Sequence, residues 1–62
     1  NPYNIGVYHI VLGENDAAIS KFNKAYDERI NDVYWLKVDP RSDAVRGDQR
    51  FQELLKKVNF PE

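Results

Sequence analysis

The strongest constraint on this chain is the spacing of small and large apolar residues in its first half. Ala18, Phe22 and Ala25 recur at helical intervals and so share one face of a helix predicted over residues 16–29. Small residues on both sides of an aromatic ring allow a second helix to approach closely. Because a turn at Gly13 separates this helix from another apolar segment, the pattern predicts two helices packed as a hairpin.

The segment before that turn, residues 1–12, is apolar on nearly every side. Asn1 can cap a helix, and Pro2 suits the first helical position because its missing N–H would be unpaired there. Gly6 suits a close approach between helices. β-Branched and aromatic residues also suit a buried strand, but the Asn-Pro start and the Gly13 stop favour a helix. A helix that is apolar all round needs neighbours on more than one side.

The second half predicts a helical connector followed by an amphipathic helix. Residues 30–38 indicate one short helix, and Asp39-Pro40 begins another short helical turn that Gly47 ends.

Asp48 then caps a final helix, whose apolar positions recur at i, i+3, i+4 and i+7: Phe51, Leu54, Leu55 and Val58. We expect Asn59 and Pro61 to end this helix and Phe60 to fold back on it.

Composition narrows the possible functions. A domain of 62 residues buries only about 60% of its unfolded surface, and this one has no cysteine for disulfides. The single His9 cannot supply a metal site alone. The net charge of −1 comes from interspersed charges, so neither nucleic acid nor an anionic membrane is expected as a partner. Without a signal peptide or a long apolar run, we expect a cytoplasmic location, and the missing initiator Met suggests a piece of a longer protein.

Over about 30 residues the chain resembles one tetratricopeptide repeat. The residues that carry the resemblance are Ile5, Gly6, Leu12, Gly13, Ala18, Phe22, Ala25 and Tyr26. The chain departs from the family at His9, where an aromatic residue is usual, and at Ile30, where the repeat usually closes with proline.

The following segment is similar to the tail that comes after the last repeat in some bacterial transcription activators, nucleotide cyclases and protein kinases. The matching residues are Trp35, Asp39, Pro40, Asp43, Arg46, Asp48, Arg50, Phe51, Leu54 and Leu55. Gln49 stands where a proline is common in that tail, and Ser42 stands where an aromatic residue is common.

The resemblance implies an all-α fold with a helical hairpin over residues 1–30 and a connector plus C-terminal capping helix over residues 31–62. A terminal repeat closes a stack with a polar outer face. The last helix has such a face and the first helix has none, so the stack is expected to continue upstream. The expected core is Ile5, Gly6, Leu12, Ala18, Phe22, Ala25, Tyr26, Trp35, Phe51, Leu54 and Leu55. The implied function is a non-catalytic scaffold that binds a protein or peptide.

The first helix of each repeat usually lines the binding groove of such an array. In this chain the expected groove residues are Tyr3, Val7, Ile10 and Val11, which would suit an apolar peptide. The same side chains could instead touch an upstream repeat or a second copy of the chain, which leaves a homodimer as an alternative function.

A small-ligand site that uses Trp35 and the arginines is a further alternative, although Trp35 beside Leu36 favours a plug between helices. Asp39 and Asp48 are better explained as helix caps, and Asp43 as a turn residue or an arginine partner, than as ligands of a cation. Arg46 is expected to pair with Asp39 or Asp43. With no nucleophile, base and orienting group in reach of one another, the sequence predicts neither an enzyme nor a cofactor.

Overall fold

Five helical elements and no strand make up residues 1–59, the part of the chain that the computed structural model describes. The α-helices are α1 (Pro2–Val11), α2 (Asn15–Asp27) and α3 (Gln49–Asn59), and the 3₁₀ helices are η1 (Asn31–Lys37) and η2 (Pro40–Val45). The expected all-α class is therefore confirmed. The expectations for Phe60 and Pro61 lie outside the described residues.

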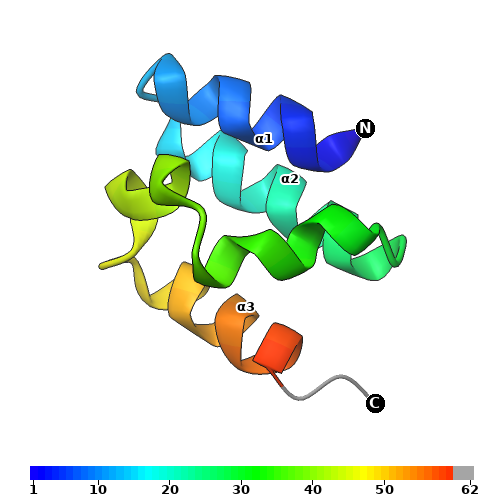
Figure 1. Cartoon of the computed structure of the whole chain (residues 1–62). Coiled ribbons are helices and arrows are strands. Elements are labelled where there is room, and N and C mark those ends of the chain that lie inside the picture. The colour runs from blue at the N-terminus through cyan, green and yellow to red at the C-terminus, as the bar shows by residue number, and fades with distance from the viewer. Residues whose placement is uncertain (60–62) are drawn as a thin grey trace.

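Helices α1 and α2 form an antiparallel pair at one end of the molecule, and α3 lies at the other end (Figure 1). The Asn1 side chain accepts a hydrogen bond from the backbone N–H of Asn4 (3.0 Å) and caps α1, with Pro2 at the start of the helix. Gly13 has φ +78°, a left-handed conformation that favours glycine and reverses the chain toward α2.

The connector between the pair and α3 consists of η1 and η2, and it crosses the molecule beside α2 (Figure 1). A 3₁₀ helix has three residues per turn, so its side chains line up in rows at i and i+3. Val33 and Leu36 form such a row in η1 and are buried, and so is Asp39, the N-cap of η2. Two short helices were expected in this segment, and both are 3₁₀ rather than α.

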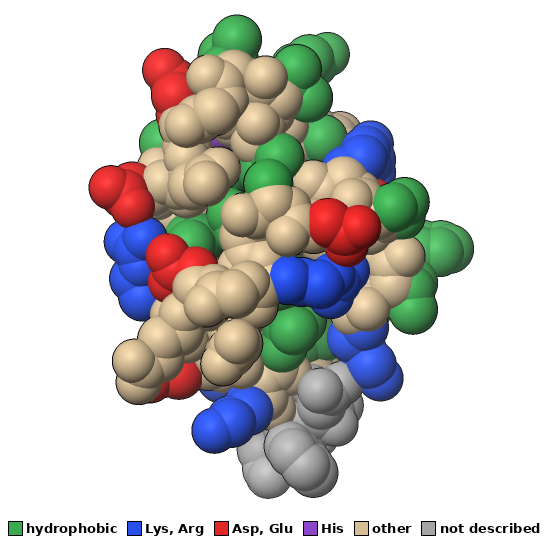
Figure 2. Space-filling model, turned by 90° about the vertical axis from the view of Figure 1, so that its left-hand side faces the viewer, with side chains coloured by type: hydrophobic (Ala, Val, Ile, Leu, Met, Phe, Trp, Pro, Cys, Tyr) green, Lys and Arg blue, Asp and Glu red, His purple; other side chains and the backbone are tan. Residues whose placement is uncertain are grey.

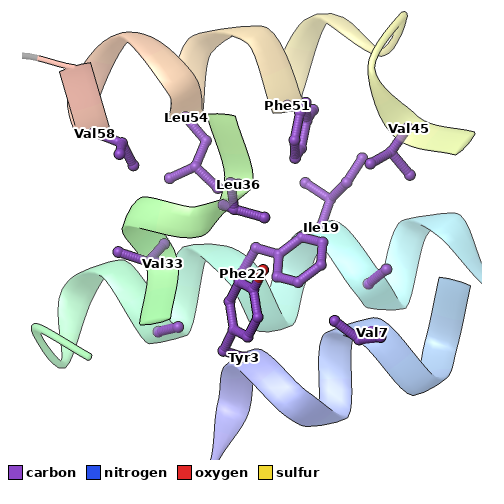
Figure 3. Packing of buried hydrophobic residues seen from close by; sticks show 12 residues of the cluster. Tyr3, Val7, Ile19, Phe22, Val33, Leu36, Val45, Phe51, Leu54 and Val58 are labelled. Carbon is purple, nitrogen blue, oxygen red and sulfur yellow. The ribbon is translucent and has the colours of Figure 1, made fainter. Parts of the chain in front are cut away.

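The core lies where α1, α2, the connector and α3 meet (Figure 3). Phe22 is fully buried at its centre, with ring centroids 5.5 Å from Tyr3 and 6.3 Å from Phe51. Gly6 of α1 faces this ring so closely that a Cβ there would lie 2.6 Å from Cε1 of Phe22. Ala18 and Ala25 on α2 are also fully buried, and Leu54 of α3 closes the core from the far side.

Two residues that were expected in the core, Ile5 of α1 and its C-cap Leu12, are exposed instead. Because α1 is apolar nearly all round, its apolar periodicity cannot tell which face packs inward. The face that carries Gly6 does so, since only a residue without a side chain leaves room for the ring of Phe22. Ile5 and Leu12 lie on the opposite face.

Trp35 was also expected in the core and is 63% exposed. The 3₁₀ geometry of η1 explains the difference, because three residues per turn place Val33 and Leu36 in one buried row and turn the intervening positions outward. Leu36, rather than Trp35, fills the space between the helices. Tyr26 and Leu55, two further residues expected in the core, are half-buried and pack against its edge.

Candidate functional site

The most distinct surface feature is an apolar face on the outer side of α1, formed by Ile5, Tyr8, Val11 and Leu12. We call it the α1 outer face. These side chains are between 43% and 76% exposed. Their separations of three and four residues place Ile5, Tyr8 and Leu12 in one stripe along the helix, with Val11 beside it. The α1 outer face is therefore continuous and open to solvent.

The four expected groove residues do not form one surface. Tyr3 and Val7 are buried, Ile10 is half-buried against the core, and only Val11 is exposed. Tyr3 and Val7 share the face of Gly6, so they pack inward for the same reason that Ile5 points outward. The expectation of an exposed groove at Tyr3 and Val7 is wrong. Tyr8 was not singled out from the sequence, although it lies one helical turn after Ile5, an apolar position already noted.

The opposite end of the molecule has a different surface. Helix α3 buries Phe51, Leu54 and Val58 and exposes polar side chains along its outer side: Gln49, Arg50, Gln52, Glu53, Lys56 and Lys57. Hydrophobic side chains instead project at the top of the molecule, where α1 lies (Figure 2). The two ends therefore differ, with a polar helix at one end and an apolar helix face at the other.

A buried polar contact ties the start of α1 to the connector. The Tyr3 hydroxyl donates to Oδ2 of Asp39 (2.5 Å), and Arg41 donates to both oxygens of that carboxylate, with Nη2 at 2.8 Å from Oδ2. Asp39 also caps η2 by accepting from the backbone N–H of Arg41 (2.9 Å). The Arg41 guanidinium holds the pKa of Asp39 well below its usual range, and burial raises the pKa of the Tyr3 phenol well above its own.

Arg46 closes the other side of the connector. Its Nη2 donates to the carbonyl oxygens of Leu36 (3.2 Å) and Asp39 (3.1 Å), and its Nε donates to Asp43 (2.8 Å). The guanidinium also lies 6.0 Å from the ring centroid of Phe51. The expected pairing of Arg46 with a nearby aspartate is present, and Arg46 also binds carbonyl oxygens near the end of η1 and at the N-cap of η2.

A third arginine joins α3 to α2. Arg50 donates from Nη2 to Asp48 (2.8 Å) and to Asp16 at the start of α2 (2.7 Å). Asp48 also accepts from the backbone N–H of Arg50 (2.8 Å) and so occupies the cap position expected for it. These hydrogen bonds from Arg50 lower the pKa of Asp48 to about 2.

Asp39, Asp43 and Asp48 thus each face an arginine rather than one another. Within residues 1–59 no three His, Cys, Asp or Glu side chains cluster closely enough to hold a metal ion. His9 lies on the surface of α1, with Nδ1 at 2.7 Å from Glu14 in the turn that follows. In the same range of residues, no helix combines the length and the apolar character that crossing a bilayer requires.

A hollow of about 350 Å³ lies between the start of α1 and the connector. Asp32, Trp35 and Val38 form one side of the hollow. Tyr3 and Asp39, which form the buried hydrogen bond described above, also line it. Asp32 and Trp35 are spaced by three residues and so share one row of η1, and Val38, the C-cap of η1, follows at the same spacing. The sequence drew attention to Trp35, but it did not indicate that a hollow would form beside it.

Comparison with models of protein families, with curated proteins and with solved structures finds no match to this chain. No function therefore follows from a matching protein.

Proposed function

We propose that this chain is a non-catalytic protein-interaction scaffold, a terminal tetratricopeptide-like repeat that closes a helical stack. The observation that carries the proposal is the contrast between the α1 outer face and the polar outer side of α3. A unit at the end of a stack needs one apolar face for its neighbour and one polar face for solvent. The resemblance of the hairpin and of the tail to repeat proteins supports the same function.

The α1 outer face suits another helix as its partner. Helix α1 already buries Tyr3, Gly6 and Val7 against the rest of the chain, so it is apolar on two opposite sides. Helices of this kind occur inside bundles and stacks, where both sides are covered. Apart from His9, α1 contains no residue that can carry a charge near neutral pH. The partner surface is therefore apolar as well.

The size of the α1 outer face distinguishes a neighbouring repeat from a second copy. A helix of 10 residues is about 15 Å long, which offers much less area than the roughly 800 Å² per partner of a stable complex. A homodimer through this face alone would be weak. A neighbouring layer of the same chain needs no such area, because covalent linkage supplies a high effective concentration.

The proposal can be tested with the double variant Tyr8→Glu/Leu12→Glu. The matched control is Ser20→Glu/Gln52→Glu, which adds the same charge at exposed positions of α2 and α3. Proteins captured by the wild-type chain are identified, purified and titrated against all three forms by calorimetry. We expect the α1 variant to lose at least about tenfold in affinity, because each glutamate would bring an unpaired charge into an apolar contact, and the control to bind like the wild type.

Equal affinity of the wild type and the α1 variant would show that the α1 outer face is not the interaction surface. Light scattering of the wild type over a range of concentrations tests the homodimer separately. A strict monomer at the highest concentration excludes self-association, whereas a dimer that the α1 variant disrupts would favour the second copy over a neighbouring repeat.

A further inference from the structure

The row of Asp32, Trp35 and Val38 forms a second surface, separate from the α1 outer face. Successive members of the row are one turn apart, which is about 6 Å along a 3₁₀ helix. The row thus places a carboxylate, an indole ring and an isopropyl group in sequence over about 12 Å. Trp35 and Val38 are 63% and 67% exposed, so the apolar part of the row is open to a ligand.

The hollow beside this row has a net negative charge. Asp39 and Arg41 form an ion pair within it, with Nη2 at 2.8 Å from Oδ2, and their charges cancel. Asp32 has a different environment: within residues 1–59, its carboxylate accepts a side-chain hydrogen bond from the neutral amide of Asn1 (3.1 Å). The carboxylate of Asp32 is therefore the uncompensated charge of the hollow, and it favours a cation over an anion.

A long basic side chain matches the order of groups in the row. Lysine and arginine carry an apolar stem that packs on hydrophobic surface and a charged end that stays in water. With its charged end at Asp32, such a side chain would lie along Trp35 and place its cation within reach of the indole face as well. The row is about as long as an extended lysine together with the backbone that carries it.

Arg41 supplies a contact for that backbone. Its Nε and Nη2 are turned toward Asp39, which fixes the orientation of the guanidinium at the edge of the hollow. Within residues 1–59, Nη1 of Arg41 donates no hydrogen bond, and the side chain is exposed. A donor held in this way suits the carbonyl oxygen of an extended peptide, whose backbone acceptors are not used internally.

We propose that the Asp32–Trp35–Val38 row binds a lysine or arginine side chain of an extended peptide, with Arg41 contacting the peptide backbone. The site is independent of the α1 outer face, so the two can be tested separately. The site would supply one ion pair at Asp32, one contact with the ring of Trp35 and one hydrogen bond from Arg41. We therefore expect weak affinity for the peptide, as for a module that binds together with other sites.

Trp35 is the only tryptophan, so its fluorescence reports directly on the site. The probe is the peptide acetyl-Pro-Lys-Pro-amide, which is extended and has no charged ends, and the comparison peptides replace lysine by glutamine or glutamate. We expect a saturable change in fluorescence with the lysine peptide, and an affinity at least about fivefold weaker for the glutamine peptide. No saturable change up to millimolar lysine peptide, or equal or tighter binding of the glutamine or glutamate peptide, would overturn the proposal.

The variant Asp32→Asn removes the charge and keeps the shape of the side chain. Its matched control is Asp27→Asn, which makes the same change of net charge at an exposed position of α2. We expect Asp32→Asn to weaken binding of the lysine peptide about threefold to fivefold and Asp27→Asn to leave it unchanged. Equal weakening in both variants would show that the peptide responds only to overall charge and would refute a site at this row.

Discussion

The close approach of Gly6 to Phe22 leads to a sharp prediction about the variant Gly6→Ala. A Cβ at Gly6 would lie 2.6 Å from Cε1, 2.8 Å from Cδ1 and 3.2 Å from Cζ of the Phe22 ring. The ring has little freedom to move, because it is fully buried and packs on both Tyr3 and Phe51. The methyl group can therefore enter only if α1 and α2 move apart.

Two opposing effects set the size of the change. Alanine is intrinsically better than glycine inside a helix by about 0.5–1 kcal/mol. Overpacking a well-filled core costs about 1–3 kcal/mol, and a contact with a ring held on both sides belongs to the upper part of that range. The expected net loss is about 1.5 kcal/mol, a large fraction of the roughly 3–5 kcal/mol that the core of so small a domain supplies.

Urea unfolding followed by circular dichroism at 222 nm measures this loss. Trp35 is a poor reporter here because it is already exposed in the folded state. For a chain of this size, the expected loss lowers the urea midpoint by roughly 1 M. The matched control is Gly47→Ala, because a Cβ at Gly47 meets no atom within 4 Å and the stability should stay equal or rise by up to about 1 kcal/mol. In Gly13→Ala the space is also open, but φ of +78° makes the variant lose about 1 kcal/mol through backbone strain.

An equal or greater stability of Gly6→Ala would refute this account of the helix pair. A double-mutant cycle with Phe22→Leu tests the cause of any loss, because a smaller side chain at position 22 relieves the contact. The penalty of Gly6→Ala should then be smaller in the Phe22→Leu background than in the wild type. An undiminished penalty would place the strain elsewhere.

The remaining predictions concern the polar contacts of the connector. Burial and the hydrogen bond to Asp39 raise the pKa of Tyr3, so the folded chain keeps a proton that the unfolded chain loses from about pH 10 upward. The free energy of unfolding should therefore fall as the pH rises through this range, and it should fall less in Tyr3→Phe. Urea titrations at about pH 9 and about pH 11 measure the difference. Because the pKa of Asp39 is lowered, its contribution to the free energy of unfolding is complete above about pH 4 and is lost as the pH falls further. Asp39→Asn should make the free energy of unfolding depend less on pH below about pH 4, and an unchanged dependence would contradict this role of Asp39. Arg46→Ala should lower the free energy of unfolding by about 1 kcal/mol, because it removes the hydrogen bonds from the guanidinium to two backbone carbonyls that keep Ser42 as a donor. Arg50→Ala, whose ion pairs are exposed, should stay near the wild type by the same measurement.

The parts of the fold that could be predicted from the sequence are those with a strong local pattern. The apolar stripe of α3 and the small–large–small spacing of α2 follow the 3.6-residue period, and Phe22 lies in the core between the two buried alanines. Asn1 and Asp39 cap the elements that they were expected to cap, because capping depends on neighbours two or three residues away.

The parts that could not be predicted depend on contacts distant in sequence. Nothing in the periodicity of α1 distinguishes the face of Tyr3 from the face of Ile5, since both are apolar. The choice is made by the space that Phe22 needs at Gly6, and the hydrogen bond from Tyr3 to Asp39 spans 36 positions. The α1 outer face and the hollow beside Trp35 could not be predicted either, because both result from that choice and from the 3₁₀ geometry of the connector.

The three-residue period of η1 also restricts how the length of the connector can change. One residue inserted or deleted ahead of Leu36 would rotate the rest of the helix by about 120°. Leu36 would leave the core, and a neighbouring side chain such as Trp35 or Lys37 would take its place. An insertion or deletion of three residues returns Leu36 to the buried row and changes only the length of the connector. Variants of this chain that keep the fold should therefore differ in connector length by multiples of three, unlike ordinary surface loops, which tolerate any number.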